Sequence, residues 1–204
     1  SVTTHAVRVN QLAQNSIWTS TTGVSDPTAT LTSSASTFTY SYNNPDSGDG
    51  LETININVPT NSSLENLRNL INTDPNNPGV KATIISDGSN SYLQVRGMDL
   101  GADADLTISN ASFYGLGGFS ETQANQNAQI RVNGWPASTW IESDSNTITD
   151  AVEGLNLTLK NANPSSDIQV SVNLDSEGVK DNIRTFVEKV NDVRSKFIAL
   201  TEFD

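Results

Sequence analysis

The sequence holds few side chains that could do acid–base or nucleophilic chemistry. Its single histidine, His5, is of the type that exchanges protons near neutral pH, so it is the first candidate for a catalytic residue. It lies in an alternating segment, residues 4–13, without a serine or aspartate motif around it. There is no cysteine, which excludes disulfides, cysteine nucleophiles and thiolate zinc sites. We interpret His5 as a strand residue and predict no catalytic residue.

Three further stretches could bind ions or phosphate. Residues 143–146 (SDSN) and 44–50 (NPDSGDG) gather acidic and amide side chains, as calcium loops do, but residues 46–50 do not match the EF-hand pattern. Residues 115–118 (GLGG) are rich in glycine, yet they do not form the glycine motif of a phosphate-binding loop. We interpret these stretches as turns and a linker, and we predict no metal and no cofactor site.

The remaining candidates are aromatic. Trp18, Trp135 and Trp140 could stack on sugar rings, as in a carbohydrate-binding module, or pack in a core or between domains. A glycosidase would need two carboxylates about 5–10 Å apart, and no feature of the sequence singles out such a pair. The sequence therefore predicts a protein that is not an enzyme, with binding to glycans as an alternative.

The elements that would hold these residues are mostly strands. Alternating apolar residues predict strands over 4–13, 37–42, 51–58, 80–86, 91–97, 106–109, 128–134 and 168–174. Leu64, Leu67, Leu70 and Ile71 have helical spacing after the possible caps Asn61 and Ser62, which predicts a helix that ends before residues 73–79 (TDPNNPG). Residues 16–36 and 110–127 are polar or glycine-rich, and we expect turns in the first and a domain boundary in the second.

Residues 145–159 (SNTITDAVEGLNLTL) combine two patterns. The spacing of Ile148, Ala151 and Val152 predicts a capped helical turn over 147–153, and alternation predicts a strand over 155–159. We expect Gly154, at the join, to have a positive φ. The C-terminal stretch has the strongest helical pattern, with a cap at Asp175 or Ser176, and its apolar stripe needs a partner. We therefore expect that the chain is cut at Asp204. The residues of that stripe are Val179, Ile183, Phe186, Val187, Val190, Val193, Phe197 and Leu200.

The composition and charge of the chain argue against nucleic acids and membranes as partners. The net charge is −12 and the basic residues are scattered, so the surface repels nucleic acids and anionic membranes. No run of about 18 apolar residues is present, and no signal peptide is visible. We predict a mainly β fold with short helices (α+β), and neither nucleic acid nor membrane as a partner.

Four blocks in order resemble one family. HAVRVNQLAQ (5–14), SLENLRNLIN with GVKATIISDG and YLQVRGMDLGA, QNAQIRVNGWPASTWIESDSNTITDAVEGLNLTLKNA, and DSEGVKDNIRTFVEKVNDV are similar to segments of flagellar filament cap proteins, also called flagellar hook-associated protein 2. The third block is the most specific. Lys189 and Val190 replace the family's usual aromatic residue before Asn191. The resemblance covers essentially the whole chain.

The resemblance implies a fragment with two small β-rich head domains and the start of a helical stalk. It places 1–30 and 112–175 in a discontinuous inner head domain, 31–111 in an inserted outer head domain, and 176–204 in the stalk helix. We expect Val7 and Val9 to be buried with the sheet of Leu155–Leu159. Phe38, Tyr40, Leu67 and Ile71 should share a separate core.

The implied function is that of a cap at the distal end of the bacterial flagellar filament, which promotes flagellin folding and insertion. The implied partners are flagellin and, in the full-length protein, further copies in a cap oligomer, whereas the fragment is expected to be monomeric. The implied location is extracellular, at the flagellum tip, after secretion through the flagellar export channel. The alternative is a surface adhesin head that binds host glycans or mucin.

Overall fold

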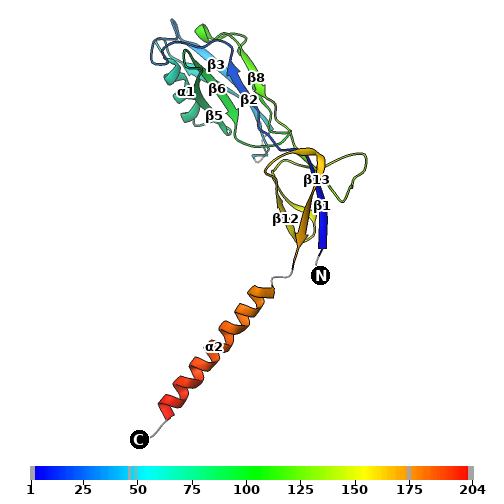
Figure 1. Ribbon diagram of the computed structural model, residues 1–204. Helices are drawn as coiled ribbons and strands as arrows, with labels where there is room; N and C mark the ends of the chain where they lie inside the picture. The colour runs from blue at the N-terminus through cyan, green and yellow to red at the C-terminus, as the bar shows by residue number, and fades with distance from the viewer. Residues whose placement is uncertain (1–2, 46, 49, 174–175, 202–204) are drawn as a thin grey trace. The chain divides into compact units, whose positions relative to one another are not determined.

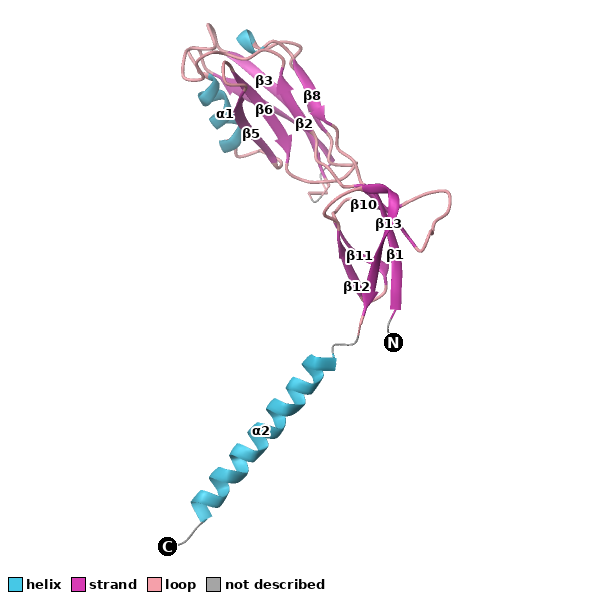
Figure 2. Cartoon of the chain, in the orientation of Figure 1, coloured by secondary structure: helices cyan, strands magenta, loops and turns pink. Residues whose placement is uncertain are grey.

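The computed structural model describes residues 3–45, 47–48, 50–173 and 176–201, and these residues form mostly strands (Figure 2). The prediction of a mainly β fold with short helices is confirmed. The described elements are β1 (Thr3–Gln11), β2 (Ile17–Ser20), β3 (Ser36–Asn44), β4 (Gly50–Val58), α1 (Leu64–Thr73), β5 (Val80–Ser86), β6 (Ser91–Gly97), β7 (Leu106–Ile108), the 3-10 helix η1 (Tyr114–Leu116), β8 (Phe119–Gln123), β9 (Ala128–Val132), β10 (Ile141–Ser143), β11 (Thr147–Val152), β12 (Leu155–Thr158), β13 (Asn163–Val172) and α2 (Ser176–Thr201).

The chain divides into two compact units, residues 7–168 and residues 1–6 with 169–204. Within the first unit we call residues 17–123 the large lobe, and residues 7–11 with 128–168 the small lobe. The strands of the large lobe pair in the orders β5-β6-β2-β8 and β4-β3-β7. In the small lobe β11 pairs with β12, and β9 lies between β10 and β1 in a sheet of order β10-β9-β1-β13.

The core of the large lobe is filled by the inward side chains of both sheets and by one face of α1. Phe38 and Tyr40 alternate with exposed or half-buried neighbours along β3 and are fully buried. Leu67 and Ile71 of α1 are buried in the same cluster, so the prediction that these four residues share a core is confirmed. In Figure 1 helix α1 lies against β5, in agreement with the contacts between these two elements.

Both ends of helix α1 are fixed by nearby residues, a capping box at its start and a proline after its end. The Ser63 hydroxyl accepts a hydrogen bond from the Asn66 backbone N–H (3.2 Å), and the Asn66 side-chain oxygen accepts one from the Ser63 N–H (3.0 Å). This reciprocal capping box satisfies two amides that have no partner inside the helix. The cap is thus one or two residues later than the predicted Asn61 or Ser62. The helix ends at Thr73, and the next residue, Asp74, has an extended backbone because it precedes Pro75.

The small lobe is built around the paired strands β1 and β9. Val7 and Val9 are buried, and their partners in β9 are Val132 and Ile130. The strand Leu155–Thr158, with which they were expected to be buried, belongs to the separate two-stranded sheet of β11 and β12. They lie outside the core cluster of the large lobe. At the surface Arg8 forms an ion pair of 2.7 Å with Asp167. Because both side chains are more than one third exposed, this pair contributes little to stability.

The predicted helical turn over residues 147–153 is wrong. Residues 147–152 form strand β11, in which Thr147 pairs with Thr158 and Ile148 pairs with Leu157. The β-branched residues Thr147, Ile148, Thr149 and Val152 favour a strand, and pairing with β12 buries Ile148. Gly154 has a φ of 76°, so its predicted positive φ is confirmed, in the turn of a hairpin.

Two segments predicted to lack strands contain one each. Residues 16–36 include β2, and residues 110–127 include η1 and β8. Strand β2 pairs with both β6 and β8, so residues 17–20 and 119–123 complete a sheet of the large lobe. Residues 17–20 and 119–123, which were expected at the margins of the inner head domain, therefore belong to the same sheet as β5 and β6, which were expected in the outer head domain.

The second unit contains helix α2, as predicted for the C-terminal stretch, and the ends of β1 and β13. The helix begins at Ser176, and the alternative predicted cap, Asp175, lies outside the described residues, as do residues 202–204. In β1 and β13 the hydroxyls of Thr4 and Ser171 share a hydrogen bond of 3.2 Å. No apolar side chain of α2 is buried within the described residues.

Candidate functional site

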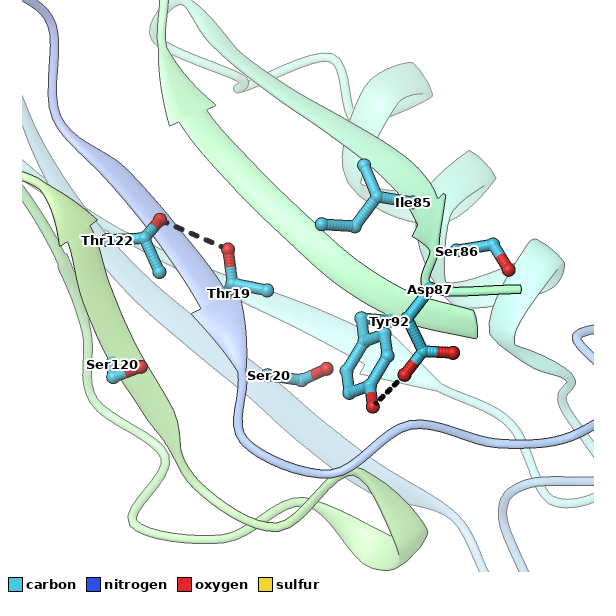
Figure 3. Close-up of a pocket in the computed structure, with 8 residues that line it drawn as sticks. All are labelled: Thr19, Ser20, Ile85, Ser86, Asp87, Tyr92, Ser120 and Thr122. Carbon is cyan, nitrogen blue, oxygen red and sulfur yellow. Dashed lines mark hydrogen bonds between the residues drawn. The ribbon is translucent and has the colours of Figure 1, made fainter. Parts of the chain in front are cut away.

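One candidate surface site is a shallow groove of about 350 Å³ on the large lobe. Its lining comes from four neighbouring strands and one turn, because β5, β6, β2 and β8 lie side by side in one sheet. Figure 3 shows the side chains that line this groove. The lining residues are Thr19, Ser20, Ile85, Ser86, Asp87, Tyr92, Ser120 and Thr122.

Strand alternation explains this composition. In β6 Leu93 and Val95 point into the core and are fully buried, which leaves Tyr92 on the outer face. Ile85 is paired with Tyr92 across β5 and β6, and it is 40% exposed. The groove therefore has an apolar part formed by Ile85 and the ring of Tyr92, surrounded by hydroxyl groups.

The acidic group of the groove is held by its own turn. Oδ1 of Asp87 accepts hydrogen bonds from the backbone N–H groups of Ser89 and Asn90, both 2.8 Å long. Oδ2 accepts one from the Tyr92 hydroxyl, also 2.8 Å long. The backbone N–H of Asn90, then that of Ser89 and then the Tyr92 hydroxyl hold the pKa of Asp87 below its usual range. The same bond to Asp87 raises the pKa of Tyr92.

This arrangement suits binding better than catalysis. An Asp with a lowered pKa is a poor general acid at neutral pH, and both of its oxygens are already occupied by the turn. The hydroxyls of Thr19 and Thr122 bond to each other over 3.2 Å. No histidine, lysine or second carboxylate lines the groove to activate them. The groove can offer a small apolar surface and neutral hydroxyl groups to a ligand.

The residues weighed from the sequence are not gathered at this groove. His5 lies on β1, as interpreted. Within the part of the chain that the structure describes, no three His, Cys, Asp or Glu side chains are grouped so that they could hold a metal ion. Asp46 and Asp49 of the 44–50 stretch lie outside that part. The side chain of Asn146, in the 143–146 stretch, bonds the backbone of Ala13.

The GLGG stretch and the tryptophans have different surroundings. Leu116 of GLGG is buried in the large-lobe core, so residues 115–118 are more than a linker. Trp18 packs against the same core. Trp140 lies under the Arg131 guanidinium, whose carbon is 4.0 Å from the ring centre, and Trp135 is 68% exposed. Packing therefore explains Trp18 and Trp140, whereas Trp135 remains open to solvent.

Sequence reasoning missed the groove itself. Residues 87–90, between the strands predicted over 80–86 and 91–97, form a turn, and nothing in the sequence marked Tyr92 or Ile85 as surface residues. Both lie in apolar strands whose outer and inner faces can be told apart only when the strand order is known. The surface of the chain adds one negative finding: among the described residues, no helix has the length and apolar character needed to cross a bilayer.

The comparisons with known proteins agree with one another. The family model "Flagellar hook-associated protein 2 C-terminus" matches residues 125–204. The flagellar hook-associated protein 2 of Salmonella typhimurium is 29% identical over 154 residues, which cover 70% of this chain and 31% of that protein. The B-type flagellar hook-associated protein 2 of Pseudomonas aeruginosa is 30% identical over 162 residues, which cover 68% of this chain and 33% of that protein. The chain thus spans about a third of the length of these curated relatives.

Solved structures give the same answer for the fold. The D1-D2-D3 domains of the flagellar cap protein FliD from Escherichia coli cover 100% of this chain and 60% of that one, with a TM-score of 0.73 and 27% identity. The D2-D3 domains of the same protein cover 85% of this chain and 94% of theirs, with a TM-score of 0.65 and 29% identity. The chain therefore belongs to the flagellar hook-associated protein 2 family, the FliD family of filament cap proteins.

Proposed function

We propose that this chain is the head region and the start of the stalk of a cap at the distal end of the bacterial flagellar filament. In this proposal the cap lies outside the cell, after export through the flagellar channel, and promotes the folding and insertion of flagellin. Support comes from the family, since the matching relatives are named flagellar hook-associated protein 2 and the matching structures flagellar cap proteins. A structural role also suits a groove that has hydroxyls but no base to activate them.

The observation that carries the proposal is the exposed apolar stripe of α2. Apart from Val187, its residues follow one another in alternating steps of four and three, which is the spacing of a coiled-coil seam. Each is between 49% and 86% exposed. Burial of such a side chain contributes about 1.5–3 kcal/mol, so a helix with this stripe is stable mainly when it is covered. The residues are Val179, Ile183, Phe186, Val190, Val193, Phe197 and Leu200.

We therefore infer that α2 packs against other helices of the full-length protein and, in a cap oligomer, of neighbouring copies. The two lobes would then be the head domains, with the small lobe as the inner one because the chain passes from β13 directly towards α2. On this view the outer head domain is the large lobe, residues 17–123, which is longer than the 31–111 expected from the sequence.

The test is complementation of cells that lack their own cap protein. The full-length gene should restore filaments, counted by electron microscopy, and a Phe186→Asp/Val193→Asp variant should not, because two charges would enter the covered seam. A matched control, Asn182→Asp/Ser195→Asp, adds the same two charges to the same helix outside the stripe and should restore them. Failure of the unaltered gene, or equal growth with the Phe186→Asp/Val193→Asp variant, would argue against the proposal.

The groove supports one alternative, a surface adhesin head. Ile85, the Tyr92 ring and the surrounding hydroxyls match the mixture of apolar and hydroxyl groups that neutral sugars contact. A glycan array should then show binding that Tyr92→Ala abolishes and Leu51→Ala, at an exposed position of β4, leaves intact. Glycan binding that is unaffected by Tyr92→Ala would show that the groove is not the glycan-binding site.

A further inference from the structure

Two segments connect the lobes of the unit 7–168, and they are paired with each other. Residues 12–16 lead into the large lobe and residues 124–127 lead out of it. Gln14 and Gln126 exchange backbone hydrogen bonds of 2.9 Å and 3.1 Å. The side-chain amide of Gln126 donates a third bond, 2.9 Å long, to the carbonyl of Leu12. The two crossing segments are therefore joined by an antiparallel β-bridge.

On the side of the large lobe, a loop after β6 bonds both crossing segments. The N–H of Gly101 donates to the carbonyl of Gln14 (3.2 Å), and the N–H of Ala102 donates to the Asn127 side-chain oxygen (2.8 Å). The side-chain amide of Asn125 donates to the carbonyl of Gly101 (3.3 Å). Each of these three bonds uses a backbone group of the loop, so the main chain of the loop is bonded to the crossing segments.

On the side of the small lobe, amide side chains again make the bonds. The Asn146 side chain makes two hydrogen bonds to the backbone of Ala13: its oxygen accepts one from the Ala13 N–H (2.8 Å), and its nitrogen donates one to the Ala13 carbonyl (3.0 Å). Gln11 donates to the carbonyl of Asn127 (2.8 Å), and the Asn127 nitrogen donates to Glu142 (3.3 Å). Asn127 thus bonds a residue of each lobe.

The lobes also touch directly at Gly101. Its φ is +102°, and a β-carbon there would lie 2.7 Å from the β-carbon and 3.0 Å from the α-carbon of Asp144. These distances are too short for any side chain, and the second atom is backbone, which cannot turn aside. The loop of the large lobe is therefore seated against the 143–146 segment of the small lobe.

We propose that Gln11, Asn125, Gln126, Asn127 and Asn146, with Gly101, form an amide clasp that makes the two lobes one rigid body. Two connecting segments without such bonds would be a hinge. The hydrogen bonds of the clasp join neutral amides and backbone groups, with Glu142 as the one charged acceptor among them, and Asp144 contacts Gly101 through its α- and β-carbons. It therefore holds across pH and salt changes that weaken joints made of ion pairs. A force on the large lobe reaches the small lobe without bending at the crossing.

The inference is independent of the proposed function and is tested on the chain itself. Because the sequence has no cysteine, Leu51→Cys and Thr149→Cys place one spin label on each lobe, at exposed positions. Pulsed electron spin resonance then gives the distribution of distances between the labels. The clasp predicts one narrow peak that is unchanged from about pH 5 to about pH 9 and from about 0.05 M to about 1 M salt.

Variants separate the clasp from general stability. Gly101→Ala should broaden or shift the distribution, whereas Gly88→Ala should not, since Gly88 also has a positive φ (+95°) but nothing within 4 Å of the added carbon. Asn127→Ala, which leaves the backbone unstrained, should broaden it as well. Circular dichroism confirms that each variant is folded. A broad distribution for the parent chain, or a narrow unchanged one for both Gly101→Ala and Asn127→Ala, would overturn the proposal.

Discussion

The rings of Phe38 and Phe113 meet edge to face, with their centres 5.5 Å apart and their planes at 89°. Phe38 comes from β3 and Phe113 from the segment 110–127 that the sequence suggested as a boundary. Both side chains are buried, so this segment contributes to the core. We predict that Phe113→Ala lowers the free energy of unfolding by about 3–5 kcal/mol. Urea denaturation measures this change.

The matched control for that prediction is Phe113→Leu, which keeps most of the buried volume and should cost less than half as much. If residues 110–118 were only a linker, Phe113→Ala and Phe113→Leu would both leave the urea midpoint where it is in the parent chain. That result would remove Phe113 from the core.

The second prediction concerns the turn between β11 and β12. Gly154→Val should destabilise the chain by about 1–3 kcal/mol, since the φ of 76° disfavours a β-branched residue. No atom lies within 4 Å of an added β-carbon, so the cost is one of backbone conformation alone. Gly154→Asn should therefore be much milder, because Asn tolerates this conformation. Equal unfolding midpoints for Gly154→Val and the parent chain would refute the argument.

The third prediction follows from the lowered pKa of Asp87. The folded turn favours the carboxylate, so its stabilising contribution is present at neutral pH and is lost as the pH falls from the ordinary Asp range, about 3.9, through the lowered value. Carboxyl carbon shifts in NMR should show Asp87 titrating below about 3.9. Tyr92→Phe removes one of the three hydrogen bonds and should raise that pKa part of the way. Titration of Asp87 at or above the ordinary value would contradict the geometry of the turn.

The fourth prediction concerns the limits of the large lobe. Residues 15–125, expressed alone, should fold and give well-dispersed amide signals in NMR, because the core cluster lies wholly between Trp18 and Phe119. Deletion of 35–111 instead should leave β2 without its partner β6 and expose apolar surface. A folded product after the 35–111 deletion, together with an unfolded 15–125 fragment, would restore the boundaries expected from the sequence.

The sequence predicted most strands and both helices, and the errors have one cause. Alternation identifies Phe38, Tyr40 and Leu93 because each strand carries several apolar residues. Ile17–Ser20 and Phe119–Gln123 are short and show no clear apolar alternation. They become strands because they pair with each other and Ile17–Ser20 also pairs with β6. The prediction of a helical turn over residues 147–153 was wrong for the same reason, since pairing of Ile148 with Leu157 overrides a weak helical pattern. The groove also depends on strand pairing, because its lining comes from the neighbouring strands β5, β6, β2 and β8.

The central claim is that this chain forms the head of a filament cap, and its location on the filament tests that most directly. In cells that lack their own cap protein, full-length protein with Leu51→Cys, at a position 65% exposed, can be labelled with a fluorescent maleimide. Protein without that substitution serves as the control, since residues 1–204 contain no cysteine. A filament cap should give a single fluorescent spot at the free end of each filament. Label along the whole filament, or at the cell body alone, would contradict it.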